Sequence, residues 1–292
     1  MRAVEIAYRY EANDVPTRPR PADPDSALLR LNEGNCAFAE LLNSVKDDGG
    51  PVRRVVHVDP RDLGLLPGAT GAPSQRPFAA VLGCADARVP LELIFNEGPN
   101  DLFVVRVAGN GLGGDVLGSL KYAVEHLGGS LKLIVVLGHS GCGAVSAAVD
   151  VFLSPGDYLP LATQPSLRQL LDRLLVVVHS SARKLVATFG PDIVRQKGYR
   201  RALMETAVVT SAALSAYSIQ QEIAANAKSA LQAVYGVYLL ETRQVWAPRL
   251  GQADEVGLAP APSDLAGFEQ LGDAMVKSPR MTALLAMEPD DH

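Results

Sequence analysis

The stretch LKLIVVLGHSGCGAV, residues 131–145, joins an apolar run to a short polar segment that carries a histidine and a cysteine. A continuous apolar run that ends in glycine is typical of a strand buried on both faces of a parallel sheet. We expect His139 at the end of this strand and a tight turn at Ser140 and Gly141. Cys142 is then expected in the first turn of the following helix, where the helix dipole lowers the thiol pKa.

Other apolar runs extend this pattern along the chain. Two further apolar runs, FAAVLG at 78–83 and LFVVRVAG at 102–109, come before residues 131–145 in the chain. The segment GDVLGSLKYAVEHLG, which follows LFVVRVAG, repeats apolar residues at helical spacing. A β-rich run at 233–240 follows a long helical region from about 165 to 227, and ETRQVW after it alternates like an edge strand. The patterns predict an α/β fold with a central, mostly parallel β-sheet, one antiparallel edge strand and flanking helices.

Both ends of the chain differ from this central part. Residues 1–26 contain four prolines and are predicted to form an extended arm without a role in the core, lying on the surface or on another subunit. The next helix is expected to start with Asp25 or Ser26 as its N-cap, and Cys36 on it to fill the core. In the C-terminal extension, residues 248–292, one helix is predicted to pack on the domain or on a partner subunit.

Composition narrows the classes of function. Of the 292 residues 48% are hydrophobic, and the formal net charge is −5, without a dense block of lysine and arginine that could follow a nucleic-acid backbone. No continuous apolar run is long enough for a membrane span, and the first residues do not resemble a secretory signal. We expect a cytoplasmic protein with no nucleic-acid or membrane partner. Three cysteines suit a reducing compartment and leave metal or thiolate chemistry open.

A second polar segment, CADAR at 84–88, directly follows the first apolar run. Ligands bind beyond the carboxyl ends of parallel strands, so the two polar segments are expected to converge on one crevice. Four candidate metal ligands then meet, namely Cys84, Asp86, His139 and Cys142. Two thiolates, an imidazole and a carboxylate or water complete a tetrahedron that suits Zn²⁺.

The pair Asp86 and Arg88 leaves two states open. If Arg88 holds Asp86 away from the metal, water takes the fourth position and the site is catalytic, whereas Asp86 on the metal closes the site. Two other interpretations use the same residues. One is a structural zinc site with four protein ligands, and the other is a redox pair of Cys84 and Cys142.

These residues resemble the β-class carbonic anhydrases, in which C-x-D-x-R is followed by H-x-x-C. Further similar stretches are LLRLNEGNCAF, FVVRVAGN, GSLKYAVEHLG and VYGVYLLETRQV. The resemblance covers residues 27–247, which it identifies as a β-carbonic anhydrase-like catalytic domain. It implies zinc-dependent, reversible hydration of CO₂ to bicarbonate and a proton through a zinc-bound hydroxide. It also implies a homodimer or a higher homo-oligomer.

The resemblance implies a role for each candidate site residue. Cys84, His139 and Cys142 would be the zinc ligands, with Asp86 as a fourth ligand in a closed state. In the open state Asp86, oriented by Arg88, would accept a hydrogen bond from the hydroxide.

Three more residues match substrate-binding positions of that family: Gln75, Phe103 and Tyr122. Gln75 would donate a hydrogen bond to an oxygen of CO₂ or bicarbonate, and the two aromatic residues would form apolar walls of the pocket. Two other functions share the motifs. One is hydrolysis of carbonyl sulfide or carbon disulfide, and the other is a catalytically silent zinc protein in which Asp86 stays on the metal.

Overall fold

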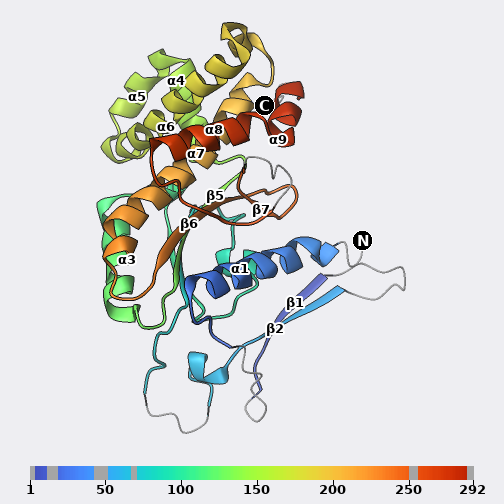
Figure 1. The fold of residues 1–292 in the computed structure, drawn as a ribbon, viewed down its shortest axis with the longest axis vertical. Coiled ribbons are helices and arrows are strands. Elements are labelled where there is room, and N and C mark those ends of the chain that lie inside the picture. The colour runs from blue at the N-terminus through green and yellow to red at the C-terminus, as the bar shows by residue number, and fades with distance from the viewer. Residues whose placement is uncertain (1–3, 12–18, 43–51, 67–70, 250–255, 288–292) are drawn as a thin grey trace.

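A central β-sheet lies between two groups of helices in the computed structural model, which describes residues 4–11, 19–42, 52–66, 71–249 and 256–287 (Figure 1). The strands are β1 (Val4–Arg9), β2 (Val52–His57), β3 (Ala79–Gly83), β4 (Leu102–Arg106), β5 (Leu133–His139), β6 (Gln232–Tyr238), β7 (Val245–Trp246) and β8 (Ala259–Pro260). The helices are α1 (Pro24–Ala39), α2 (Leu91–Ile94), α3 (Gly114–Leu127), α4 (Gly143–Leu153), α5 (Tyr158–Ala162), α6 (Pro165–Phe189), α7 (Tyr199–Glu222), α8 (Leu265–Val276) and α9 (Pro279–Ala286).

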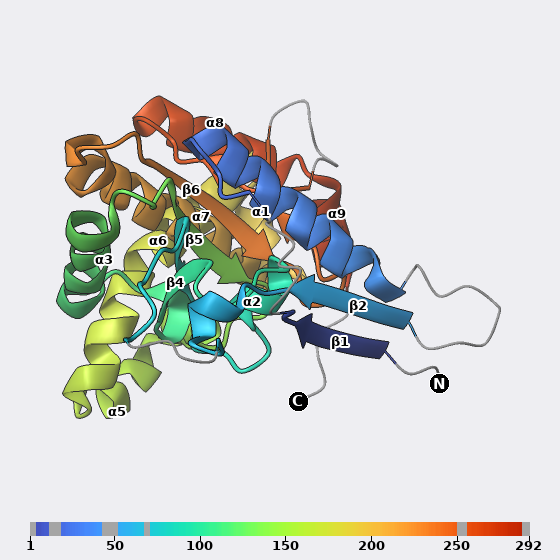
Figure 2. The same cartoon turned by 90° about the horizontal axis from the view of Figure 1, so that it is seen from below.

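The central sheet has the strand order β4-β3-β5-β6, and all four strands are parallel. The short strands β7 and β8 both pair with β6 in the antiparallel direction. The predicted fold class is therefore confirmed, although two short strands, and not one, make the antiparallel edge. β1 and β2 form a separate parallel pair beside α1 (Figure 2). The sequence of β2, VRRVVH, contains no continuous apolar run, and this strand escapes prediction.

Each face of the central sheet carries its own core. Successive residues of a strand point to opposite faces, so Leu82 of β3 and Val136 of β5 pack with residues of α4, α6 and α7. Their neighbours Val81 and Val135 pack with residues of α1 and α2. Every residue of β3 and β5 is buried, and this burial on both faces explains why their sequences are continuously apolar.

The first helix begins earlier than predicted, because its N-cap is Asp23 and neither Asp25 nor Ser26. Asp23 Oδ1 accepts a hydrogen bond from the N–H of Ser26 at 2.8 Å, and Ser26 Oγ accepts one from the N–H of Asp23 at 3.2 Å. Pro24 occupies the first helical position, where its missing N–H costs nothing. The two reciprocal bonds form a capping box, so the proline that suggested a break in fact starts the helix.

Two other N-terminal features bear on the predictions. Within the predicted arm, residues 4–9 form β1 outside the central sheet, while residues 1–3 and 12–18 lie outside the described residues. The predicted place of Cys36 in the core is wrong, because this side chain is exposed. The buried side of α1 passes through Leu31 and Asn35, and Cys36 is turned away from it.

The C-terminal extension forms two helices on the body of the same chain, where one helix was predicted. Asp264 caps α8 through a hydrogen bond to the N–H of Gly267 at 2.8 Å, and α8 lies against α6 and α7. Leu271 and Met275 of α8 are buried, whereas Leu265 at its start is exposed. α9 packs beside α7, and residues 288–292 lie outside the described residues.

One described helical stretch, Tyr199–Asn226, is long and apolar enough to cross a membrane, judged by length and composition alone. It contains α7, which packs against β5 and β6, and most of its apolar part is buried inside the fold. A core helix passes the same test, so this stretch is weak evidence for a membrane span.

Candidate metal centre and active site

The carboxyl ends of β3 and β5 bring three candidate ligands together. Gly83 at the end of β3 is in register with Leu137 of β5, so Cys84 emerges beside the end of the neighbouring strand. Donor atoms of Cys84, His139 and Cys142 all lie within 4.8 Å of one another, and the three residues are buried. Parallel pairing thus unites two polar segments that lie far apart in the sequence.

The turn between His139 and Cys142 depends on a glycine. Gly141 has a φ of +63°, a left-handed conformation that other residues adopt only with strain. His139 is the last residue of β5, and Cys142 is the N-cap of α4. Cys142 therefore stands just before the helix and not in its first turn, as was predicted, but it still faces the free N–H groups of the helix start.

His139 presents a ring nitrogen that needs a partner. Its Nδ1 lies 2.9 Å from the carbonyl oxygen of Ser140, so Nδ1–H donates there and Nε2 carries the lone pair. Within the described chain this Nε2 is buried without a hydrogen-bond partner. An unsatisfied buried nitrogen is costly, whereas Nε2 with two nearby sulfurs is a donor set that Zn²⁺ prefers. The residues therefore fit a bound Zn²⁺.

The two thiols are coupled, and their contact favours one thiolate over two. A hydrogen bond from Cys142 lowers the pKa of Cys84 to about 3, and the N–H of Gly109 donates to the same sulfur at 3.3 Å. The resulting thiolate, together with burial, raises the pKa of Cys142 above its usual range. The N–H groups at the start of α4 lower the pKa of Cys142, as predicted, but the neighbouring Cys84 and burial raise it by more. Burial lowers the pKa of His139, but Cys84 and Asp86 raise it by more.

Arg88 holds Asp86 at the edge of this cluster. Arg88 Nε lies 3.0 Å from Asp86 Oδ1, Nη2 lies 2.7 Å from Oδ2, and the backbone N–H of Arg88 lies 2.9 Å from Oδ1. These bonds keep the pKa of the Asp86 carboxyl well below its usual range. Asp86 Oδ2 is 3.7 Å from His139 Nε2. The carboxylate therefore borders the cluster while Arg88 holds it.

Arg106, at the end of β4, supports the same segment and escapes prediction from the sequence. Its Nε donates to the carbonyl oxygen of Cys84 at 3.0 Å, and its Nη2 donates to that of Asp86 at 2.5 Å. A single charged residue in the otherwise apolar run LFVVRVAG is the signal that could have singled it out. Gly109 follows shortly after, with a φ of +64° that turns its N–H toward Cys84.

The three predicted substrate-binding residues do not join this cluster within one chain. Gln75 precedes the start of β3, whereas Cys84 follows its end, and a strand of this length separates the two ends by roughly 16 Å. Phe103 lies near the start of β4, which runs parallel to β3. Tyr122 is exposed on α3 and stacks on His126, with ring centroids 4.4 Å apart.

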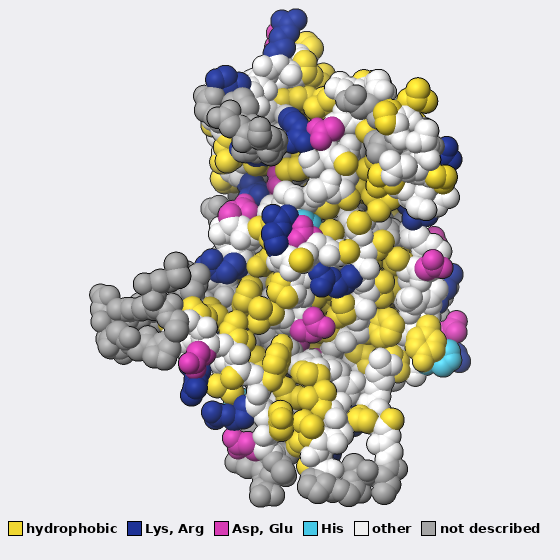
Figure 3. Space-filling model, turned by 180° about the vertical axis from the view of Figure 1, so that it is seen from behind, with side chains coloured by type: hydrophobic (Ala, Val, Ile, Leu, Met, Phe, Trp, Pro, Cys, Tyr) yellow, Lys and Arg dark blue, Asp and Glu magenta, His cyan; other side chains and the backbone are white. Residues whose placement is uncertain are grey.

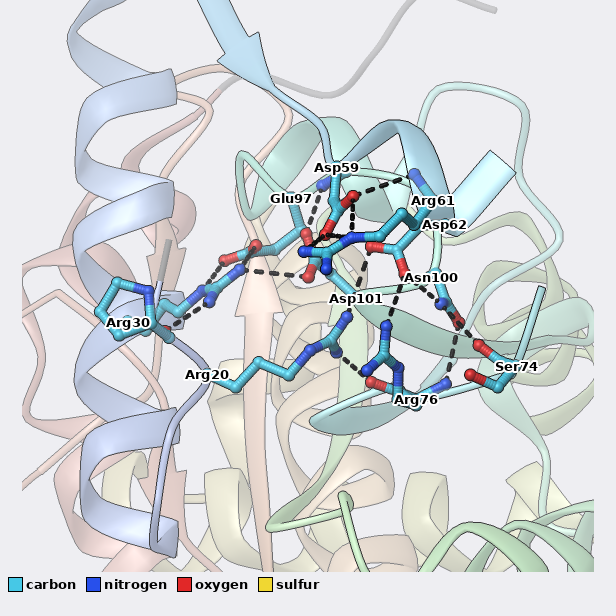
Figure 4. A network of polar contacts seen from close by, with 12 residues as sticks. Arg20, Arg30, Asp59, Arg61, Asp62, Ser74, Arg76, Glu97, Asn100 and Asp101 are labelled. Atoms are coloured by element: carbon cyan, nitrogen blue, oxygen red, sulfur yellow. Dashed lines mark hydrogen bonds and ion pairs between the residues drawn. The ribbon is translucent and has the colours of Figure 1, made fainter. Parts of the chain in front are cut away.

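A network of polar contacts holds the segment that carries Gln75 (Figure 4). Asn100 Nδ2 donates to the carbonyl oxygen of Ser74 at 3.0 Å, and Asn100 Oδ1 accepts from the N–H of Arg76 at 3.0 Å. One side chain thus binds both neighbours of Gln75, and Asp62 accepts a further bond from Asn100 at 2.8 Å. The backbone of this segment is held in place while the side chain of Gln75 remains exposed.

Comparison with known proteins places the chain in a family. The family model described as carbonic anhydrase matches residues 79–245, more than half of the chain, and the chain belongs to this family. Carbonic anhydrase 2 of Mycobacterium tuberculosis is 42% identical over 140 residues, which are 47% of this chain and 59% of that protein. The carbonic anhydrase of Mycolicibacterium smegmatis is 39% identical over 129 residues, which are 44% of this chain and 54% of that protein. The chain thus spans less than two thirds of the length of these relatives.

Solved structures of the same family are also similar. A structure of tetrameric β-carbonic anhydrases from Sordaria macrospora has a TM-score of 0.43 and 23% identity, covering 59% of this chain and 80% of that chain. The family match confirms the resemblance to the carbonic anhydrases that the motifs indicated. It includes every residue of the cluster, from Cys84 to Cys142, and excludes Gln75 and the helices α8 and α9.

Proposed function

We propose that this protein catalyses the reversible hydration of CO₂ to bicarbonate and a proton, with Zn²⁺ held by Cys84, His139 and Cys142. The observation that carries the proposal is the convergence of two sulfurs and an unpartnered imidazole nitrogen beside a carboxylate that an arginine restrains. A structural zinc site has four protein ligands, so it would not need Arg88 to restrain Asp86 beside the metal position.

The residues of the chain supply what the reaction needs around the metal. Zn²⁺, when bound, supplies a Lewis acid that lowers the pKa of a water ligand, an effect for which carbonic anhydrases are the standard example. Asp86 stays ionised at neutral pH because Arg88 lowers its pKa. It is therefore a hydrogen-bond acceptor that orients the attacking water, and a poor base. The proton released passes to solvent, which reaches the partly exposed Asp86.

We further propose a homo-oligomer in which a second copy of the chain completes the substrate pocket. Gln75 precedes β3 and Phe103 lies near the start of β4, whereas Cys84 follows the end of β3, so they can serve a pocket only in another copy. Asn100 holds both neighbours of Gln75, and the side chain of Gln75 is exposed, which supports this proposal. Hydrophobic side chains also gather between scattered charges on one face of the molecule (Figure 3), and large exposed apolar surfaces favour association.

A cytoplasmic location is proposed from the chemistry of the thiols. Cys36, Cys84 and Cys142 are all free. Free thiols, two of them in a candidate metal site, suit a compartment in which cysteines are kept reduced.

The decisive experiment is stopped-flow CO₂ hydration from about pH 6.5 to about pH 9, on protein whose zinc content has been counted. Zinc-loaded protein is expected to show activity that rises with pH, and His139→Ala is expected to lose both zinc and activity. Fully zinc-loaded but inert protein would overturn the proposal, and a sulfide-release assay would then test carbonyl sulfide and carbon disulfide. Sedimentation of the active protein as a monomer would refute the shared pocket.

A further inference from the structure

The loop between the candidate ligands His139 and Cys142 rests on two carboxylates that come from other parts of the chain. The N–H of Gly141 donates to Glu205 Oε1 of α7 at 3.0 Å, and Ser140 Oγ donates to Glu241 Oε2 at 2.9 Å. Glu205 is buried, with 3% of its surface exposed. Each carboxylate thus uses one oxygen to hold one residue of the turn.

The second oxygen of each carboxylate binds the same arginine. Arg280 Nη2 lies 2.9 Å from Glu205 Oε2, and Arg280 Nη1 lies 2.5 Å from Glu241 Oε1. The guanidinium, with its rigid fork of donors, therefore joins two acids that each hold the turn through their other oxygen. In its absence, two negative charges would face each other next to a cluster that is itself rich in negative charge.

Arg280 belongs to α9, beyond the residues that match the family. The start of this helix is firmly placed, because Ser278 Oγ accepts from the N–H of Met281 at 3.1 Å and donates to the carbonyl oxygen of Met275 at 2.7 Å. Ser278 is buried, and Pro279 occupies the first helical position. The cap fixes where the helix begins and hence where Arg280 enters the network.

We propose that Arg280 is a positioning residue of the metal centre, supplied by the C-terminal extension. Through Glu205 and Glu241 it fixes the turn at Ser140 and Gly141, and so sets how the side chains of His139 and Cys142 stand relative to each other. This inference rests on the proposed function only in that the cluster binds Zn²⁺. Partners that orient metal ligands typically change metal affinity by about 10- to 100-fold when they are removed, and we expect an effect of that size.

A merely structural role for Arg280, as a tie between α9 and the body, must be told apart from positioning. The chain offers a matched control in Lys184 of α6, whose Nζ lies 3.3 Å from Glu269 and 2.7 Å from Asp273 of α8. Lys184 also ties the C-terminal extension to the body through two carboxylates. These two carboxylates lie on α8, and neither holds the turn between the metal ligands.

The test compares the full-length variants Arg280→Met, Arg280→Lys and Lys184→Met after loading with zinc. Zinc transfer to a chromogenic chelator gives the affinity, the absorption bands of Co²⁺-loaded protein report the ligand geometry, and thermal unfolding reports stability. Arg280→Met is expected to bind zinc roughly 10- to 100-fold more weakly and to show shifted cobalt bands. Arg280→Lys is expected to recover part of the affinity, since its ammonium keeps the charge but cannot span both carboxylates.

Lys184→Met is expected to keep wild-type zinc affinity and cobalt bands even where it lowers the unfolding temperature. Wild-type zinc affinity and cobalt bands in Arg280→Met would overturn the inference, as would an equal loss of zinc from Lys184→Met. If Arg280→Met does not fold, Glu241→Gln replaces it. Glu241 is half exposed, and this substitution weakens one of the two ion pairs that Arg280 makes with the acids holding the turn. A wild-type protein that binds zinc but does not hydrate CO₂ would refute the proposed function. The role of Arg280 could still be tested, because its test measures zinc affinity.

Discussion

Replacing Arg88 with methionine separates the restraint on Asp86 from the metal site itself. Arg88 acts on the cluster through Asp86, so Arg88→Met is expected to keep its zinc and to lose part of its activity. The backbone N–H of residue 88 still donates to Asp86 Oδ1 in this variant, at 2.9 Å in the present structure. The carboxylate is therefore loosened and not released.

The size of the loss follows from the two side-chain bonds that disappear, at 3.0 and 2.7 Å. A buried charge-assisted hydrogen bond contributes about 1.5–3 kcal/mol. The side chain of Arg88 is 60% exposed, however, so solvent screening reduces the contribution of the pair to about 1 kcal/mol, the upper end for an exposed ion pair. At about 1.36 kcal/mol for each factor of ten, kcat/KM for CO₂ hydration should fall about fivefold.

The chain contains a matched control for this measurement in Asp59 and Arg61. Arg61 Nε and Nη2 bind Asp59 at 2.9 and 2.6 Å, the N–H of Arg61 lies 2.9 Å from Asp59 Oδ1, and the Arg61 side chain is 58% exposed. Arg61→Met removes the same kind of pair away from the metal site and should leave kcat within about twofold of wild type. Stopped-flow rates at equal zinc content decide the matter. Equal rates in Arg88→Met and Arg61→Met, or loss of zinc from Arg88→Met, would refute the reasoning.

Three further predictions concern the ligands, the second chain and the thiols. Cys142→Ser removes one sulfur of the donor set and should abolish stoichiometric zinc, measured by elemental analysis; a variant with full zinc would contradict the assignment. Asn100→Ala frees both neighbours of Gln75 and should raise KM several-fold with kcat largely kept, as Gln75→Ala should, and an unchanged KM in both variants would refute a role for Gln75. Metal-free protein at pH 7 should show the ultraviolet absorbance of one thiolate, because the pKa of Cys84 is lowered to about 3 while those of Cys142 and Cys36 are raised. This absorbance should disappear as the pH falls toward about 3, and a spectrum with two thiolates or none at pH 7 would contradict the coupling of the two thiols.

The parts of the fold that the sequence predicts are those whose environment is uniform along the segment. β3 and β5 are buried on both faces, and this burial requires a continuous run of apolar residues in each strand. β7 lies within ETRQVW, where an alternating edge strand was predicted. β8 has two residues, Ala259–Pro260, and so short a strand contains no period that could be read. Its existence depends on the edge that β6 forms elsewhere in the chain.

The residues of the candidate site also fall into those that the sequence predicts and those that it does not. Cys84, His139 and Cys142 lie in two short segments whose chemistry is visible in the sequence. Arg280 is different, because it meets Glu205 and Glu241 only after α9 has packed beside α7. Arginine is mostly a surface residue, so no local pattern distinguishes Arg280 from an ordinary surface charge.

The two D-x-R segments show why a short motif identified this site only in combination with a strand. In both segments the arginine folds back on the aspartate two residues earlier, and the backbone N–H bonds are 2.9 Å long in each. The local sequence thus determines the fork of charges and nothing more. Asp86 differs from Asp59 because β3 ends just before it, which places Asp86 Oδ2 3.7 Å from His139 Nε2 at the end of the neighbouring parallel strand. The feature that indicated a metal centre was therefore the buried strand followed by a thiol. The ion pair of Asp86 and Arg88 has a role only because β3 places it beside His139.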